Sequence, residues 1–176
     1  MNLHLGCGSK YIPGFVHVDL LDYPHVDFRV PVDRLTFAED DSIELIYASH
    51  VLEHFGRHET DRVLAEWHRV LKRGGVLRCA VPDFEAITQR YLRTGNLNEL
   101  VGLVCGGQKD QHDYHKMIFD QNTLTGRLLG AGFSSVSRYD WRKTEHSSLD
   151  DYSQAYLPYM DKVNGQLMSL NLEATK

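Results

Sequence analysis

A close pair of glycines lies between two short apolar segments near the start of the chain, in the stretch HLGCGSKYIPGFVHVDL. Residues 2–5 and 15–20 each predict a short strand. Gly6 and Gly8 allow a sharp turn in which the backbone approaches a ligand without intervening side chains. A parallel crossover usually takes about a dozen residues, and a Pro-Gly pair interrupts this one, so we expect the first crossover helix to be nearly absent.

The next part of the chain predicts strands around one helix. Residues 26–30 and 42–49 predict further strands, and the second is a nearly continuous apolar run typical of a buried strand. Residues 59–72 predict a helix that ends at a left-handed Gly74-Gly75 stop. Its single apolar face carries Val63, Leu64, Trp67, Val70 and Leu71. A strand over residues 76–81 follows and is expected to end at Pro82.

Two more helices are predicted further along the chain. Residues 84–94 predict a helix that Gly95 ends. Asn122 is predicted to cap a second helix, which ends at Gly132. The apolar residues of that helix are Leu124, Leu128 and Leu129.

Two late strands complete the pattern. Residues 134–141 predict one strand, and residues 166–173 predict a last, half-buried strand, with Met168, Leu170 and Leu172 on one face. No strong helix separates these strands, so we expect them to pair antiparallel. Strands that alternate with helices predict a single α/β domain over residues 1–176 with a mainly parallel sheet.

The composition narrows the classes of function. The chain has 176 residues and a formal net charge of -5, which argues against a general nucleic-acid binder with a basic surface. Its three cysteines match neither a disulfide framework nor a zinc ribbon. No apolar run reaches the length of a membrane span, and the first residues do not resemble a signal peptide. We therefore expect a cytoplasmic protein.

The glycine turn fits some nucleotides better than others. Dinucleotide enzymes add a third glycine and a long helix whose N-terminus holds the pyrophosphate, but Tyr11 occupies that glycine position here. Asp19 also comes too soon after Gly6, since the acidic residue of the dinucleotide pattern lies about 20 residues on. A ligand without a pyrophosphate, such as adenosine joined to an amino acid, tolerates both differences. A purely structural turn would need the same glycines.

Three segments together resemble a known superfamily. The segments LHLGCGSKYIPGFVHVDL, DRLTFAEDDSIELIYASHVLEHF and VLKRGGVLRCAVPD are similar to successive motifs of class I S-adenosylmethionine-dependent methyltransferases, and most of all to small bacterial ones with a short first crossover. The resemblance covers residues 2–83 and is weaker over residues 119–133. It implies a Rossmann-like methyltransferase fold with S-adenosyl-L-methionine as the cofactor.

The resemblance also assigns residues to parts of the cofactor. It places the turn of Gly6, Cys7 and Gly8 beside the cofactor, Asp19 with Leu20 at the ribose hydroxyls, the segment Asp33, Arg34 and Leu35 along the adenine, and Ser49 with His50 at the methionine part and the methyl group. One carboxylate can accept hydrogen bonds from two adjacent hydroxyls. Asp22 is the alternative ribose ligand.

The five letters HVLEH also match an inverted zinc-peptidase pattern, with His50, Glu53 and His54 as its members. Such peptidases place that motif inside a long helix and add a carboxylate ligand. Here the motif directly follows a predicted strand, so we expect no metal, and we expect Glu53 and His54 to fix the turn into the next helix.

The sequence says less about the molecule that accepts the methyl group and about the catalytic base. A hydroxyl acceptor calls for a base, and histidine suits neutral pH; His115 is the first candidate and His50 the second. We expect residues 106–116, with Gly106-Gly107 as a hinge, to close over the cofactor, because the chain starts directly at the first strand. The alternative is a solvated loop that contains His112, Asp113, Tyr114, His115 and Lys116.

The net charge favours a small-molecule acceptor, such as a hydroxylated metabolite, sugar or lipid intermediate, over nucleic acid. A homodimer that covers the site is also left open. Two other functions compete with methyl transfer: a module that binds the cofactor without turnover, and a nucleotide-sugar or dinucleotide enzyme.

Overall fold

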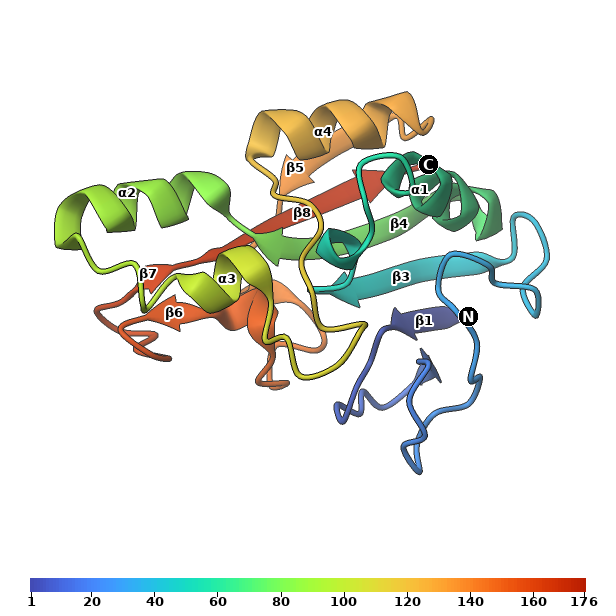
Figure 1. The fold of residues 1–176 in the computed structure, drawn as a ribbon. Coiled ribbons are helices and arrows are strands. Elements are labelled where there is room, and N and C mark those ends of the chain that lie inside the picture. Colours follow the sequence, from blue (N-terminus) through green and yellow to red (C-terminus); the bar gives the residue numbers. More distant parts are fainter.

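A six-stranded sheet forms the centre of the structure, a computed structural model that describes residues 1–176 (Figure 1). The strand order is β2-β1-β3-β4-β8-β5. Four neighbouring strands are parallel: β1 (Asn2–Leu5), β2 (Phe15–Val18), β3 (Ile43–Ser49) and β4 (Leu71–Pro82). The strand β8 (Ser169–Thr175) runs antiparallel to both β4 and β5 (Ser135–Arg138). The predicted α/β sheet, mainly parallel with an antiparallel late pair, is confirmed.

The first two strands pair in parallel with no helix between them, as the short crossover predicts. The predicted strand over residues 26–30 is wrong, because only Phe28 forms an isolated bridge, to Val18. The backbone N–H groups of Asp27 and Phe28 both donate to the carbonyl of His17, so the segment meets the sheet at one point instead of extending a ladder. Strand β2 is therefore the edge of the sheet.

The helix α1 (Thr60–Val70) packs its predicted apolar face into the core. The Trp67 ring is fully buried, and its N–H donates to the Val32 carbonyl over 2.9 Å. The predicted end of this helix is wrong: Leu71 already pairs with Ile43 in the sheet, and the left-handed Gly74 lies inside β4. Sheet pairing ends the helix before the glycines can.

The other helices agree with the sequence-based predictions only in part. Helix α2 (Phe84–Thr94) has the predicted bounds, with left-handed Gly95 after it. A short helix, α3 (Val101–Cys105), was not expected. Asp120 caps α4 (Gln121–Gly130) by accepting the Thr123 N–H over 2.7 Å, so the predicted Asn122 cap is wrong. Within α4, Leu124 and Leu128 are buried and Leu129 is exposed.

Three single-turn 3-10 helices and a two-stranded sheet complete the regular secondary structure. They are η1 (Leu52–His54), η2 (Trp141–Lys143), η3 (Tyr152–Gln154), β6 (Tyr156–Leu157) and β7 (Gln166–Leu167). The last long strand is not half-buried as predicted, because Ser169 and Asn171 are buried as well as its apolar residues. It lies inside the sheet, between β4 and β5. No helix has both the length and the apolar character needed to cross a bilayer.

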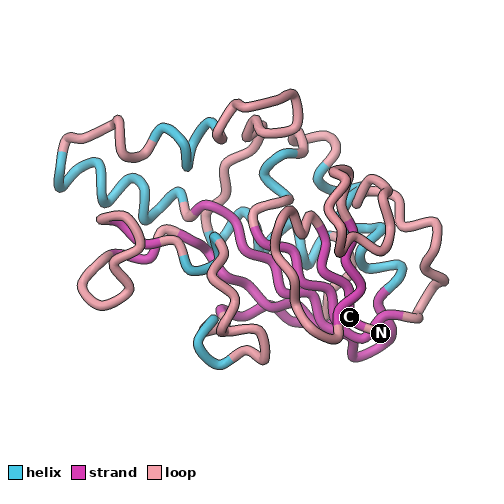
Figure 2. The backbone as a smooth tube through the Cα atoms, turned by 90° about the horizontal axis from the view of Figure 1, so that it is seen from below, coloured by secondary structure: helices cyan, strands magenta, loops and turns pink.

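The two faces of the sheet are covered differently. Helices α1 and α4 lie over one face, above the largest apolar cluster (Figure 1). Mostly loop segments cross the other face (Figure 2). Aromatic and imidazole rings meet on that second face: the His4 ring lies 5.5 Å from the His17 ring and 5.4 Å from the Tyr47 ring, which lies 4.0 Å from His146. The short crossover leaves this space to side chains.

This ring cluster predicts acid sensitivity. Burial, together with His17, His146 and His25 nearby, lowers the pKa of His4 to about 3. The unfolded chain takes up a proton at this residue below about pH 6.5, whereas the folded chain does not until about pH 3, so the free energy of unfolding falls as the pH decreases through that window. We expect His4→Phe to reduce this fall, as measured by urea unfolding between pH 4 and pH 7. An unchanged pH slope would mean that His4 does not take part.

Candidate cofactor and active site

The carboxyl ends of the four parallel strands meet at one edge of the sheet. Three of them are followed by a predicted site residue, Gly6 after β1, Asp19 after β2 and His50 after β3, and β4 is followed by Asp83, which caps α2. Ligands of open α/β sheets bind outside the carboxyl ends of the strands. The fold therefore gathers these groups where such a ligand would lie.

The glycine turn is held by the end of β2. The backbone N–H groups of Gly6 and Cys7 donate to the carbonyl of Val18 over 2.8 and 3.4 Å. Gly6 and Gly8 both have a positive φ, but a Cβ on Gly6 would lie 2.5 Å from a Val51 methyl, whereas a Cβ on Gly8 would meet nothing within 4 Å. Gly6 is thus required by packing, and Gly8 leaves space on the open side of the turn.

Cys7 is a buried residue of this turn. Its sulfur lies 3.9 Å from His25 Nε2, and burial raises the pKa of the thiol to about 12. The side chain is therefore a neutral, small core group at physiological pH, and only the Cys7 backbone belongs to the open turn.

Asp19 ties the turn to the segment that follows β2. Its Oδ2 accepts the Gly8 N–H over 2.7 Å, and its Oδ1 accepts the Leu21 N–H over 2.8 Å. Each oxygen keeps a further lone pair, so the carboxylate can still accept hydroxyl groups. The neighbouring Leu20 is exposed, and Asp22 is exposed beside Arg29.

The predicted adenine segment is anchored to α1. The Asp33 carboxylate pairs with Arg62 over 3.0 Å, and the Leu35 N–H donates to Glu66 over 2.7 Å. The Leu35 side chain is fully buried in the main core. The adenine contact stays a prediction, and it falls on Asp33 and Arg34, because the Leu35 side chain exposes no surface.

A strained backbone and an unpaired hydroxyl group lie at the end of β3. His50 has a φ of 55°, in the left-handed region that costs a non-glycine residue about 1–2 kcal/mol. The buried Ser49 hydroxyl has no hydrogen-bond partner. Backbone strain of this kind clusters at functional sites, and both residues stand where the sequence predicts the methionine part of the cofactor.

The His50 ring is held by residues of β8. Its Nε2 lies 3.2 Å from the Ser169 hydroxyl, which donates to Asn171 Oδ1 over 2.9 Å. The Tyr152 ring lies 5.4 Å from His50. Sequence reasoning missed these three neighbours, although the polar residues that alternate with Leu170 and Leu172 were a signal that both faces of this strand matter.

Glu53, in η1, is completely buried, and neither carboxylate oxygen has a hydrogen-bond partner. His50 Nδ1 lies 3.2 Å from Oε1 but out of line for a hydrogen bond. Burial on its own raises the pKa of Glu53, but the facing His50, His54 and His115 rings outweigh it and leave the pKa below its ordinary value. The expectation that the Glu53 and His54 side chains fix the turn into α1 is wrong, because the Glu53 oxygens have no partner and His54 Nδ1 lies 3.1 Å from the Tyr114 carbonyl. The Glu53 carbonyl instead accepts the Lys116 N–H over 2.8 Å.

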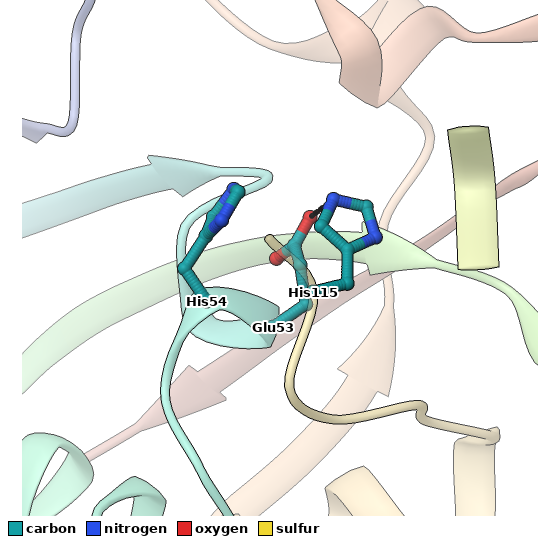
Figure 3. Close-up of side chains that lie close together, drawn as sticks. All are labelled: Glu53, His54 and His115. Carbon is teal, nitrogen blue, oxygen red and sulfur yellow. Dashed lines mark ion pairs between the residues drawn. The ribbon is translucent and has the colours of Figure 1, made fainter. Parts of the chain in front are cut away.

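The segment of residues 106–116 brings one of its two histidines to this carboxylate. His115 Nε2 lies 3.9 Å from Glu53 Oε1, and His54 lies beside the same carboxylate (Figure 3). Burial lowers the pKa of His115, which favours the neutral ring. His112 is exposed, and its Nε2 lies 3.1 Å from the side-chain amide of its neighbour Gln111. A Cβ on Gly106 would overlap the Asp113 carbonyl, so this glycine permits a close approach; its role as a hinge stays a prediction.

Comparison with known proteins shows which domain family and which fold the chain resembles. Residues 17–79 match a family model described as a methyltransferase domain. No curated protein matches the sequence. A methyltransferase structure from Archaeoglobus fulgidus is 14% identical, with a TM-score of 0.58 over 99% of this chain and 85% of that one. A Mesorhizobium loti methyltransferase is 17% identical, with a TM-score of 0.57 over 99% and 90%.

A third similar structure contains ligands. It is the 1,6-didemethyltoxoflavin-N1-methyltransferase of Burkholderia thailandensis, with bound 1,6-didemethyltoxoflavin and S-adenosylhomocysteine. It is 16% identical, with a TM-score of 0.59 over 99% of this chain and 70% of that one. The fold is thus the Rossmann-like methyltransferase fold. The match over residues 17–79 and this fold make the chain similar to class I S-adenosylmethionine-dependent methyltransferases.

The two glycines of the turn predict different consequences of the same substitution, mainly on folding at Gly6 and mainly on ligand binding at Gly8. We expect Gly6→Ala to destabilise the fold by about 1–3 kcal/mol or more, because the new methyl overlaps Val51. We expect Gly8→Ala to cost only the strain of its positive φ, about 1–2 kcal/mol, and to weaken S-adenosylhomocysteine binding at least tenfold. Urea unfolding and calorimetry measure the two effects. Normal ligand binding by Gly8→Ala would mean that the turn is only structural.

Proposed function

We propose that this chain binds S-adenosylmethionine at the carboxyl ends of β1, β2 and β3 and transfers the methyl group to a small hydroxylated molecule. The observation that carries the proposal is the convergence of the open Gly8 turn, the Asp19 carboxylate and the strained His50 at one sheet edge. The three groups follow three adjacent parallel strands.

Each part of the cofactor has a complementary group in this proposal. The free lone pairs of Asp19 accept the two ribose hydroxyls, while Gly6, Cys7 and Gly8 border the ligand with backbone alone. Asp33 and Arg34 flank the adenine. The unpaired Ser49 hydroxyl is available to the methionine part, next to His50.

The reaction itself makes modest demands on the protein. The acceptor oxygen forms a bond to the methyl carbon, the carbon–sulfur bond breaks, and the positive sulfonium becomes a neutral thioether. Most of the rate can come from holding the acceptor in line with that bond and excluding water. Residues 106–116 are the proposed cover, since they already lie against η1 through Lys116 and Glu53.

A hydroxyl acceptor must also lose its proton, and His115 and His50 are the proposed bases. Both rings face the Glu53 carboxylate, which stabilises an imidazolium after proton transfer. A small acceptor is supported by the net charge of -5 and by the small heterocycle bound to the Burkholderia thailandensis enzyme.

Calorimetry with S-adenosylhomocysteine tests the cofactor site directly. We expect micromolar binding, about -8 kcal/mol. Asp19→Asn should lose about 1.5–3 kcal/mol of that binding, because a charge-assisted acceptor is replaced in part by a donor. The matched control is Asp22→Asn, which changes an exposed carboxylate three residues away and should bind as the parent does.

The same measurements can contradict the proposal. A loss of affinity on Asp22→Asn with none on Asp19→Asn would move the ribose site. Binding of NAD or a UDP-sugar, with no binding of S-adenosylmethionine or S-adenosylhomocysteine, would replace the function with that of another nucleotide enzyme. Circular dichroism of Asp19→Asn separates lost binding from lost folding, since Asp19 also holds the Gly8 backbone.

A further inference from the structure

Two segments far apart in the sequence bring a carboxylate and two imidazoles together. Glu53 and His54 lie in η1, and His115 lies in the segment before α4 (Figure 3). One ligand atom from each of the three lies within 4.8 Å of the others. A fourth group, His50 Nδ1, lies 3.2 Å from Glu53 Oε1.

The carboxylate at the centre lacks the partners that burial demands. Glu53 is fully buried, and both of its oxygens are without a hydrogen bond. A buried charge is costly unless it is paired and hydrogen-bonded, or coordinates a metal. The other buried acidic side chains of this sheet edge, Asp19 and Asp83, both accept backbone N–H groups.

Both imidazoles are oriented in the way that metal ligands usually are. His115 Nδ1 lies 2.9 Å from the Leu103 carbonyl, and His54 Nδ1 lies 3.1 Å from the Tyr114 carbonyl. A carbonyl only accepts, so each Nδ1 carries the hydrogen and each neutral ring keeps its lone pair on Nε2. Metal-binding histidines typically donate their second N–H to such a group.

The neighbours of His50 fix its lone pair as well. The single proton of the Ser169 hydroxyl has two acceptors, Asn171 Oδ1 over 2.9 Å and the Val81 carbonyl over 3.4 Å. With its proton donated to either one, the Ser169 oxygen accepts from His50 Nε2. In a neutral His50 the Nδ1 lone pair therefore lies close to a carboxylate oxygen, an arrangement that a cation between them stabilises.

We propose that Glu53, His54 and His115 bind a divalent first-row transition metal ion, with His50 as the fourth group. Imidazole nitrogens with one carboxylate suit ions such as zinc or cobalt, whereas magnesium and calcium prefer oxygen ligands. Bonds of about 2.0–2.1 Å require the ligand atoms, which now lie within 4.8 Å of one another, to move closer together when the ion binds.

The position of the ion bears on the acceptor. The site includes His50 and lies next to Ser49, and the proposed function places both residues at the methyl group. A metal ion there binds acceptors that carry an oxygen ligand and favours their deprotonated form. This step rests on the proposed function, whereas metal binding itself does not.

Metal titration of tag-free, chelator-treated protein tests the site. We expect one Co²⁺ ion per chain, with a visible absorption spectrum that Zn²⁺ abolishes. Glu53→Gln and His115→Gln should each weaken Co²⁺ binding at least tenfold. The matched control is His112→Gln, which changes an exposed histidine three residues from His115 and should bind as the parent does. His54→Gln, at a less buried position, provides a second variant if Glu53→Gln fails to fold.

Parent-like Co²⁺ binding by both His115→Gln and His54→Gln would overturn the site, as would the absence of binding to the parent protein. Tighter binding of Mg²⁺ than of Co²⁺ or Zn²⁺ would overturn the choice of ion. Asp19→Asn should keep its metal affinity while its S-adenosylhomocysteine affinity falls. That comparison separates a failure of the metal site from a failure of the proposed function.

Discussion

The parallel pairing of β1 and β2 across a connection without a helix is the constraint on which the proposed ligand-binding edge of the sheet depends. So short a turn cannot satisfy its own backbone N–H groups through helical hydrogen bonds. The Val18 carbonyl takes two of them, and the Asp19 carboxylate takes that of Gly8. The carboxylate proposed to bind ribose is therefore also a structural part of the turn, which holds it in position before any ligand arrives.

The same short crossover shapes the face of the sheet that α1 and α4 do not cover. With no helix above β1 and β2 on that face, the space is filled by loop segments and by the rings of His4, His17, Tyr47 and His146. These rings pack well when they are neutral, but a proton taken up by any of the three imidazoles would place a charge in the protein interior. Stability at neutral pH is thus linked to a sensitivity to acid that a purely aliphatic face would not have.

Around Glu53 the chain places ionisable side chains in a buried position that packing alone would fill with apolar ones. Its backbone is tied to the segment before α4 through the Lys116 N–H, while its carboxylate faces three histidines instead of hydrogen-bond donors of the main chain. A proton carrier and a metal ion use the same lone pairs, so the proposed base catalysis and the proposed metal binding would draw on one cluster. The strained His50 connects this cluster to the sheet edge proposed to bind the cofactor.

Much of this structure was determined by local sequence. Strands β1 and β3, the buried face of α1 and both ends of α2 follow from periodicity and capping, which act within a few residues. Gly6, Asp19 and His50 could be predicted to lie together, because the carboxyl ends of parallel strands share one edge.

Only the tertiary structure decided where α1 ends, how Asp27 and Phe28 meet β2, and which residues surround His50 and Glu53. Ser169 lies 119 residues from His50, and Tyr114 lies 60 residues from His54. Contacts over such separations depend on strand order and loop packing, which no local pattern encodes.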